Sequence, residues 1–296
     1  MAIPASEVAL FEGQRTRLFG LAYRMLGSAT EAEDVVQDVY LRWHGAHHET
    51  IQAPSAWLAK VATNLCLTRL TSARARRERY VGPWLPEPVL TATGALGPLE
   101  TVEQRESVSM GVLLLLERLS PLERAVLVLR DAFGHRHREI ADVLGIAEDH
   151  SRQLHHRARQ HVAAERVRFE NDPERHQALV RRFFDAALHG DVATLEQLLA
   201  EDVVSWADGG GATTAARRPI TGRPAVLRYL LGIAHRPEAV RVTVEIAEIN
   251  GGTAVLPRLD GTVLAVLVPE ISAGLVSRIR LVLNPAKLRY LTAQLE

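Results

Sequence analysis

Six polar side chains between residues 150 and 160 could recognise a nucleic acid without any covalent step. They are Arg152, Gln153, His155, His156, Arg157 and Arg159. Over residues 150–168 five arginines and four histidines stand against one acid, although the chain of 296 residues has no formal net charge. A local cationic excess attracts phosphates, and an arginine that contacts a base edge contributes about 1–3 kcal/mol to discrimination. These residue types therefore indicate noncovalent binding to DNA.

The flanking sequence predicts a rigid element that presents these side chains. Residues 120–123 form a capping box with proline at the first helical position, which predicts a helix that starts at Pro121 and stops at Gly134. Two further helices are expected over residues 136–144 and from residue 148 onwards, with a tight turn between them. Side chains of the last helix that are expected to be buried are Leu154, Ala158 and Val162. The pattern predicts a helix-turn-helix whose second helix lays its N-terminal half in a major groove.

An all-helical unit is also expected earlier in the chain, over residues 6–79. Periodicity predicts helices over residues 10–26, 31–43 and 54–70, and the middle one is expected to begin at a Thr30/Glu33 capping box. The buried stripe of the last helix is expected to be Trp57, Leu58, Val61, Ala62 and Leu65. Polar side chains left facing outwards on this helix, or in the basic run after it, are Lys60, Thr63, Asn64, Arg69, Arg74, Arg76 and Arg77.

A linker is expected over residues 80–107, before the helix-turn-helix unit of residues 108–170. Its first part is rich in proline and glycine, which excludes a helix and predicts an extended tether. Trp84 and Leu85 are out of place in a solvated tether, so another part of the chain is expected to cover them.

The last unit, residues 172–296, combines helices and strands. A helix capped by Asp172 is expected to end at Gly190, and a shorter helix then leads to a strand around residues 203–206. Further strands are expected from residue 240 on, because apolar and polar residues alternate there and turn sequences separate the runs. Helices followed by a meander of strands predict an α+β domain.

Several blocks of this sequence resemble one protein family. The helix-turn-helix spacing from Glu139 to Arg159 is similar to the -35-reading domain of bacterial extracytoplasmic-function RNA polymerase sigma factors. Residues 32–43 look like the core-polymerase-binding helix of the same family. Three short motifs narrow the resemblance to the subgroup with a fused C-terminal SnoaL-like domain, and their residues are Trp84, Leu85, Pro86, Asp208, Gly209, Gly210, Gly211, Asn284, Pro285, Lys287 and Leu288. The fold this implies is multidomain: two all-α sigma domains, the region 2 helical bundle and the region 4 helix-turn-helix, then an α+β SnoaL-like (NTF2-like) cone domain.

The resemblance also implies functional residues and partners. Core polymerase, through its β′ clamp and β flap, and promoter DNA are the expected partners. Residues expected to bind polymerase are Asp34, Gln37, Asp38, Leu41, Arg42 and Trp43. The outward residues of 60–77 given above are expected to contact the -10 element. A flipped base of that element is expected to be held by Asn64 and the loop of residues 49–52. The six side chains of residues 152–159 are expected to contact the -35 element. The C-terminal domain is expected to tune activity in cis.

Some positions depart from the family pattern. His150 and Ser151 stand where a small residue and a buried valine are usual, and His137 stands where an aromatic residue is common. Looser packing at the start of the recognition helix is therefore expected. Ala286 replaces an acid, and Thr68 stands at a position often held by aspartate.

Other interpretations of the same residues stay open. The basic helix face could be merely solvated, and Glu31, Glu33 and Asp34 could only complement a helix dipole. Asp208 could sit in a flexible glycine turn, act as a general base in the cone, or serve as a latch, and the latch is the most economical role. Two rival classes are a ligand-sensing helix-turn-helix regulator and a SnoaL-like enzyme fused to DNA-binding domains.

The remaining expectations are mostly negative. We expect a protein that is not an enzyme and that has no cofactor and no metal. The single cysteine, Cys66, excludes an internal disulfide and a multi-cysteine zinc site. A small ligand in the C-terminal domain is left open. The absence of a signal peptide and of a long apolar run predicts a cytoplasmic protein.

Overall fold

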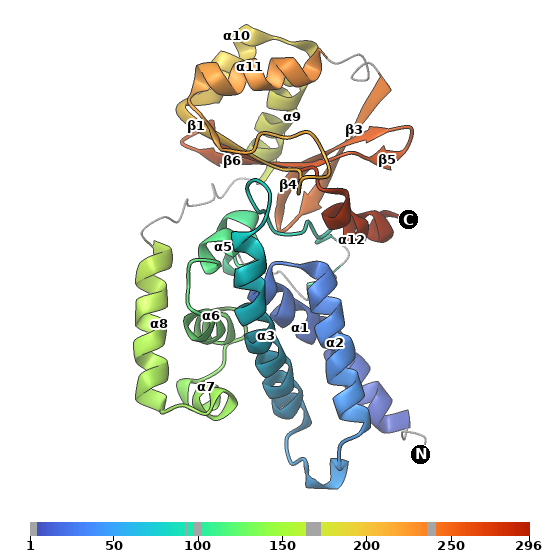
Figure 1. Cartoon of the computed structure of the whole chain (residues 1–296), viewed down its shortest axis with the longest axis vertical. Coiled ribbons are helices and arrows are strands. Elements are labelled where there is room, and N and C mark those ends of the chain that lie inside the picture. Colours follow the sequence, from blue (N-terminus) through green and yellow to red (C-terminus); the bar gives the residue numbers. More distant parts are fainter. Residues whose placement is uncertain (1–4, 93, 97–101, 164–172, 236–240) are drawn as a thin grey trace. The chain divides into compact units, whose positions relative to one another are not determined.

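The computed structural model describes residues 5–92, 94–96, 102–163, 173–235 and 241–296. The chain forms two compact units (Figure 1). Unit 1 comprises Met1–Glu78 and Thr93–Arg166, and unit 2 comprises Arg79–Ala92 and Val167–Glu296. The first part of the predicted linker therefore belongs to the C-terminal unit. Asp172, the predicted helix cap, lies outside the described residues.

Unit 1 is helical throughout its described residues. Its elements are α1 (Ala5–Leu26), α2 (Ala29–His44), the 3-10 turn η1 (His48–Thr50), α3 (Pro54–Glu78), α4 (Val102–Glu106), α5 (Met110–Leu116), α6 (Pro121–Leu127), the π-helical turn η2 (Val128–Ala132), α7 (His137–Leu144) and α8 (Glu148–Ala163). Short α4 lies inside the predicted linker. The predicted Ser120 capping box is present, with Glu123 reaching back to the Ser120 backbone N–H.

Helix α2 begins earlier than the sequence predicted. Its N-cap is Ser28, whose hydroxyl accepts a hydrogen bond from the Glu31 N–H, so the Thr30 capping box was wrong. Gly27 precedes it with φ +66°, a left-handed conformation that ends α1 and lets Ser28 take the cap position. Apolar residues of α2 then lie four and three apart on its buried face.

Helix α3 is the central helix of unit 1. It packs against α1, α2, α6 and α7, and it runs eight residues beyond the predicted end at residue 70. Cys66 lies on it, fully buried, and burial raises the pKa of its thiol to about 12. A helix with neighbours on several sides has little surface left for ligands. Some of the α3 side chains that were expected to contact DNA are therefore used in contacts within unit 1.

The predicted helix-turn-helix is confirmed by α7, α8 and the turn between them. Gly145 ends α7 in the left-handed region (φ +66°), and its N–H donates to the Ala141 carbonyl. Ser151, Leu154 and Ala158 are the buried residues of α8, while Val162 is only half-buried. The recognition helix is thus held along one face.

Unit 2 is an α+β domain, as predicted. Its elements are α9 (Pro173–His189), α10 (Val192–Leu198), β1 (Leu199–Asp208), β2 (Ile220–Thr221), α11 (Arg223–Ala234), β3 (Val242–Ile249), β4 (Gly252–Leu259), β5 (Thr262–Val263), β6 (Val266–Ser272), β7 (Leu275–Val282) and α12 (Pro285–Leu295). The sheet order is β2-β1-β7-β6-β4-β3, with β1 and β7 parallel and β5 paired to β4. Helices α9 to α11 cover one face, where Phe183, Leu230 and Ile279 contribute to the core (Figure 1).

Segment Arg79–Ala92 is held on unit 2 by backbone hydrogen bonds. The Asn250 N–H donates to the Val89 carbonyl, and the Thr91 N–H donates to the Glu248 carbonyl. Leu85 and Val89 are buried. The C-terminal unit therefore covers the tether residues that were expected to need cover. Among the described residues, no helix is both long and apolar enough to cross a membrane.

Candidate nucleic-acid and polymerase interfaces

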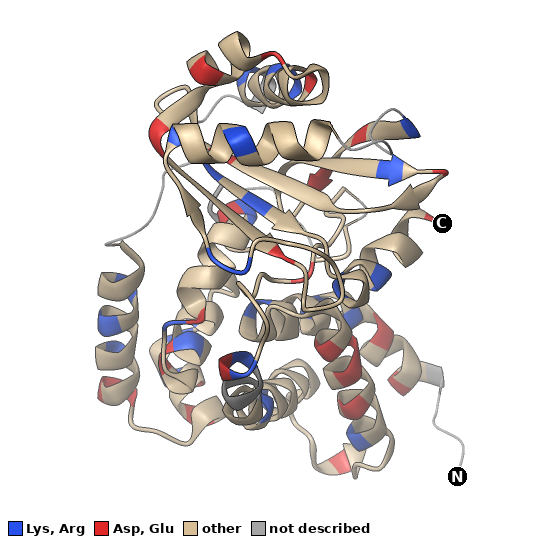
Figure 2. Ribbon diagram, turned by 45° about the horizontal axis from the view of Figure 1, so that its top comes forward, with Lys and Arg blue, Asp and Glu red and all other residues tan. Residues whose placement is uncertain are grey.

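The basic side chains of α8 lie mainly on its outward face. Exposed residues on this face are Arg152, Gln153, His156, Arg157 and Arg159. Arg152 pairs along the helix with Glu148 and Asp149, but its side chain is 58% exposed, so solvent screens these pairs and leaves the guanidinium available to a phosphate. Figure 2 shows the basic residues along this helix.

His155 does not belong to that outward face. Its side chain is only 15% exposed, and its Nε2 lies 2.8 Å from the Asp131 carboxylate of η2. The same carboxylate accepts a hydrogen bond from Arg159, whose side chain stays 66% exposed. The structure thus does not group His155 with the exposed basic residues, because its ring is turned towards an acid, and its contact with DNA stays a prediction.

On α3, the predicted DNA-reading residues divide into two groups. Lys60 and Asn64 are exposed, and the Lys60 ammonium donates to the Asp142 carbonyl of α7 at 2.9 Å. Thr63 is fully buried, and its hydroxyl donates to the Ala59 carbonyl one turn earlier. Thr63 was therefore wrongly assigned to DNA contact, since packing around the central helix encloses it.

Arg69 and Arg77 are also used within unit 1. Arg69 reaches the carboxylates of Asp38 (2.7 Å) and Asp34 (3.5 Å) on α2. Arg77 donates to the Leu26 carbonyl at 2.6 Å and pairs with Glu117. Neither guanidinium points freely to solvent, so the expectation that both contact DNA is not met here. The side chains of Arg74 and Arg76 lie outside the described residues.

A buried arginine completes the Glu117 cluster. Arg124 of α6 is 2% exposed and donates to the Leu116 carbonyl (2.7 Å) and the Met25 carbonyl (2.6 Å), while its Nη2 lies 2.7 Å from Glu117. Burial lowers the pKa of Arg124 to about 9, so it remains positively charged at neutral pH. Carbonyls at the end of α1 lack helical partners, and the two arginines satisfy them.

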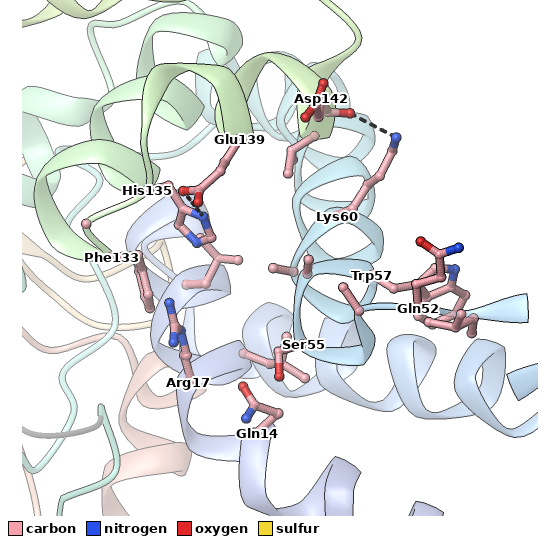
Figure 3. Close-up of a pocket in the computed structure, with 18 of the residues that line it drawn as sticks. Gln14, Arg17, Gln52, Ser55, Trp57, Lys60, Phe133, His135, Glu139 and Asp142 are labelled. Atoms are coloured by element: carbon pink, nitrogen blue, oxygen red, sulfur yellow. Dashed lines mark hydrogen bonds and ion pairs between the residues drawn. The ribbon is translucent and has the colours of Figure 1, made fainter. Parts of the chain in front are cut away.

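A groove of about 800 Å³ lies among α1, the loop before α3, and the region from Phe133 to α7. Figure 3 shows Gln52, Ser55 and Trp57 on its α3 side, and His135 and Glu139 opposite. Thr50, Ile51 and Gln52, from the loop predicted to hold a flipped base, line it, and Lys60 lies at its edge. Burial, with Arg17 nearby, lowers the pKa of His135, which favours the neutral ring. The groove has both aromatic and hydrogen-bonding walls, which suit an unstacked base.

The outward face of α2 carries most of the predicted polymerase residues. Asp34, Gln37, Leu41 and Arg42 are exposed, and Leu41 is 58% exposed although it is large and apolar. Acidic positions mark this helix in Figure 2. Trp43 is 2% exposed, and its indole N–H donates to the Glu7 carbonyl, so its assignment to polymerase binding was wrong: it is a core residue.

In unit 2, Asp208 is the centre of the three motif segments. It is fully buried at the end of β1. Its carboxylate accepts hydrogen bonds from the Tyr80 hydroxyl, the Leu85 N–H (2.8 Å) and the Lys287 ammonium (2.7 Å). We call Tyr80, Leu85, Asp208 and Lys287 the latch. Burial and the bond to Asp208 raise the pKa of Tyr80, which stays protonated.

The latch is closed by further contacts to Lys287. Its ammonium lies 4.7 Å from the Tyr80 ring centroid and 4.3 Å from that of Trp84, and it donates to the Leu85 carbonyl. A buried ammonium with a carboxylate, a carbonyl and two aromatic faces is well compensated. Three donors occupy the Asp208 carboxylate, which fits the latch alternative better than a general base that needs a free carboxylate oxygen.

The glycines after Asp208 form no flexible turn. Gly210 has φ +57°, and a Cβ there would lie 2.1 Å from the Asn284 side chain. At Gly209 a Cβ would lie 2.5 Å from the Thr213 carbonyl oxygen. Asn284 in turn caps α12 and donates to the Tyr80 hydroxyl at 2.8 Å. A side chain at position 210 would therefore displace Asn284 and the Tyr80 hydroxyl from the glycine segment.

Comparison with known proteins gives this arrangement its context. Family models match Sigma-70 region 2 over residues 10–76, Sigma-70 region 4 over residues 109–162, and a SnoaL-like domain over residues 180–273. The chain is 39% identical over 261 residues to the ECF RNA polymerase sigma factor SigJ of Mycobacterium tuberculosis, covering 86% of this chain and 83% of that protein. It is 31% identical over 289 residues to the probable ECF sigma factor SigI of the same species, covering 97% and 96%.

A solved structure agrees with these matches. The crystal structure of the M. tuberculosis SigJ aligns with a TM-score of 0.75 at 34% identity, covering 96% of this chain and 98% of that one. Regions 2 and 4 define the class of RNA polymerase sigma factors. The chain belongs to the extracytoplasmic-function family of that class, with a SnoaL-like domain fused at its C-terminal side. It therefore binds core RNA polymerase and promoter DNA and directs promoter-specific initiation of transcription.

Proposed function

We propose that three exposed faces divide the work of initiation. Outward residues of α8, which are Arg152, Gln153, His156, Arg157 and Arg159, read the -35 element in the major groove. Lys60, Asn64 and the Thr50–Gln52 edge of the groove hold the opened -10 strand. The observation that carries this proposal is the α8 face itself, where basic side chains stand outward above a buried seam of Ser151, Leu154 and Ala158.

The third face, which we propose binds polymerase, is the outward face of α2. Exposed Leu41 lies on the same helix as the exposed polar residues Gln37 and Arg42, so this face offers apolar and polar side chains to a partner. We assign this face to the β′ clamp, and region 4 to the β flap. We also infer a cytoplasmic location, because initiation requires core polymerase and promoter DNA.

Run-off transcription with core polymerase on a promoter selected from a random library tests the α8 assignment. Arg157→Ala is expected to lower initiation about tenfold, since one base-edge arginine contributes about 1–3 kcal/mol. Arg228→Ala, which removes an exposed arginine from α11, is the matched control and should leave initiation unchanged. Equal output from both variants would remove α8 from promoter recognition.

We further propose that the C-terminal domain regulates initiation by holding the tether. Our domain assignment is region 2 at residues 6–79, a linker at 80–107, region 4 at 108–170 and the regulatory domain at 172–296. Segment Arg79–Ala92 could span about 45 Å if fully extended. When the latch holds this segment on unit 2, the segment can no longer extend between α3 and α4. The connection is then effectively shorter, which limits how far regions 2 and 4 can separate.

The test compares the whole chain with a version that ends near Asp172, and with Asp208→Ala. Both changes release the tether and are expected to raise run-off transcription several-fold. Asp202→Ala, at an exposed acid on the same strand, is the matched control. If the shortened and whole chains initiate equally well while both bind core polymerase, regulation through the tether is wrong.

A further inference from the structure

Two departures from the family pattern meet at the base of the recognition helix. His137 stands at the start of α7, where an aromatic residue is common, and Ser151 stands in the first turn of α8, where a buried valine is usual. In this chain His137 Nδ1 lies 3.0 Å from the Ser151 hydroxyl. Ser151 is fully buried. A directional hydrogen bond thus occupies the place of an apolar contact.

His155 and Asp131 extend this contact. The His155 ring packs edge-on against the His137 ring, with centroids 5.4 Å apart and planes at 61°. His155 Nε2 lies 2.8 Å from Asp131 on η2, whose second oxygen accepts from Arg159 at 3.1 Å. These contacts link η2 to α8 through Asp131 and His155, and α8 to α7 through the two histidine rings and the His137–Ser151 hydrogen bond.

These contacts lie where they can set the angle of α8. Its buried side chains beyond the first turn, Leu154 and Ala158, hold the middle of the helix. Ser151 and His155 hold its N-terminal half, which is the half that enters the groove in a helix-turn-helix. A hydrogen bond depends on distance and angle, whereas apolar packing is non-directional.

We propose that His137, Ser151, His155 and Asp131 form a polar joint that fixes the angle of the recognition helix, and that they are positioning residues for -35 recognition. The inference rests on the proposed -35 role of α8.

The charges around the joint make it sensitive to protonation. Facing His137 are the cations Arg130 and Arg152, the ring of His155, and the acid Glu148. Burial is the main cause that lowers the pKa of His137, and the neighbouring positive groups lower it further. A group with a lowered pKa in the folded state contributes stability above its unfolded pKa of about 6.5, and this contribution is lost as the pH falls through the lowered value. Acid is therefore expected to loosen the joint.

Binding measurements with the full chain and core polymerase test the joint. The readout is the ratio of affinities for a duplex carrying the selected -35 element and for a scrambled duplex. Ser151→Ala removes one methyl-sized hydroxyl and is expected to lower this ratio about three- to tenfold, since it leaves the His137 nitrogen without its partner. The double variant His137→Phe with Ser151→Val supplies an apolar joint and is expected to restore the ratio to within about threefold.

The pH profile separates a positioning role from simple loss of stability. From about pH 7.5 to about pH 5.5, the ratio is expected to fall several-fold for the parent chain and to stay nearly constant for the double variant. His161→Gln removes an exposed histidine of the same helix that lies outside the joint, and it should behave like the parent. A double variant that keeps the parent profile would overturn the proposal.

Arg157→Ala distinguishes failure of the joint from failure of the proposed -35 role of α8. If Arg157→Ala weakens -35 binding while Ser151→Ala leaves the ratio unchanged, the positioning role of the joint is wrong and the -35 role of α8 is supported. If neither variant alters the ratio, the -35 role of α8 fails first, and the joint fails with it.

Discussion

Each of the two units has a carboxylate that ties distant segments together, and the two are built differently. Glu117 in unit 1 joins Arg77, at the end of α3, to Arg124 on α6. Asp208 in unit 2 joins the tether to α12. The Glu117 side chain is 17% exposed and meets two guanidiniums, whereas Asp208 is fully buried and meets one ammonium, one hydroxyl and one backbone N–H.

The difference indicates which of the two ties costs more free energy to break. Around Glu117 the arginines keep other acceptors, the Met25 and Leu26 carbonyls, if the acid is removed. In unit 2 the Lys287 ammonium and the Leu85 N–H both donate to the Asp208 carboxylate. Removing one partner of a buried pair leaves an uncompensated charge, so the fully buried tie is the more costly one to break.

Asp208→Ala should therefore have the largest effect. We expect the free energy of unfolding of unit 2 to fall by about 3–5 kcal/mol, because the buried Lys287 ammonium loses the Asp208 carboxylate and the Leu85 N–H loses its acceptor. Urea unfolding followed by tryptophan fluorescence measures it. Asp202→Ala should stay within about 0.5 kcal/mol of the parent. Equal midpoints for the two variants would contradict a stabilising latch.

Glu117→Gln should come second. The expected loss for unit 1 is about 2–3 kcal/mol, smaller because the group is partly exposed and the two arginines keep their carbonyl acceptors. Unfolding monitored by circular dichroism gives the value, with Glu12→Gln on the exposed side of α1 as control. A loss larger than that of Asp208→Ala would reverse the ranking of the two ties.

Gly210→Ala tests whether the latch needs its glycine. The left-handed φ and the clash with Asn284 predict a loss of about 1–3 kcal/mol in unit 2. Gly232→Ala is the contrasting variant, because that glycine lies inside α11 with open space around its Cβ position. There we expect a gain of about 0.5–1 kcal/mol. Opposite signs in thermal unfolding would bear out this contrast.

The smallest effect is expected at the β3-β4 hairpin. Glu245 pairs with Arg258 at 2.8 Å, with the glutamate side chain 44% exposed. Glu245→Gln should cost about 0–1 kcal/mol, and the difference should shrink in high salt. A larger loss of unfolding free energy that does not depend on salt would show that exposure alone does not distinguish weak ion pairs from strong ones.

The sequence predicted most of what periodicity and caps determine. Helices α6 to α8 and the turns between the later strands, at Asn250 and Asp260, were expected from local patterns. At Ser28 the pattern misled, because two candidate caps stand two residues apart and only the backbone at Gly27 decides between them.

Contacts between distant segments were harder to predict. Arg69, Arg77 and Thr63 sit on the outer positions of a helical wheel, but α3 has neighbours on most sides, so these positions are used inside the unit. Helix α8 is packed along one face, and its outward residues were largely predicted correctly. Tyr80 and Arg124 were missed altogether, since their partners lie 128 and 99 residues away and a single sequence gives no signal for such pairs.

Cys66 can serve as a probe of how often unit 1 opens. It is the chain's single cysteine, it is fully buried on the central helix, and its thiol pKa of about 12 leaves almost no thiolate at neutral pH. An alkylating reagent reacts with thiolate, so labelling requires the helices around α3 to part first. The rate at which this one sulfur is modified therefore reports how often region 2 opens, free of any signal from the C-terminal domain. Oxidant sensing by a thiol is correspondingly a poor fit to this chain, whatever signal switches it on.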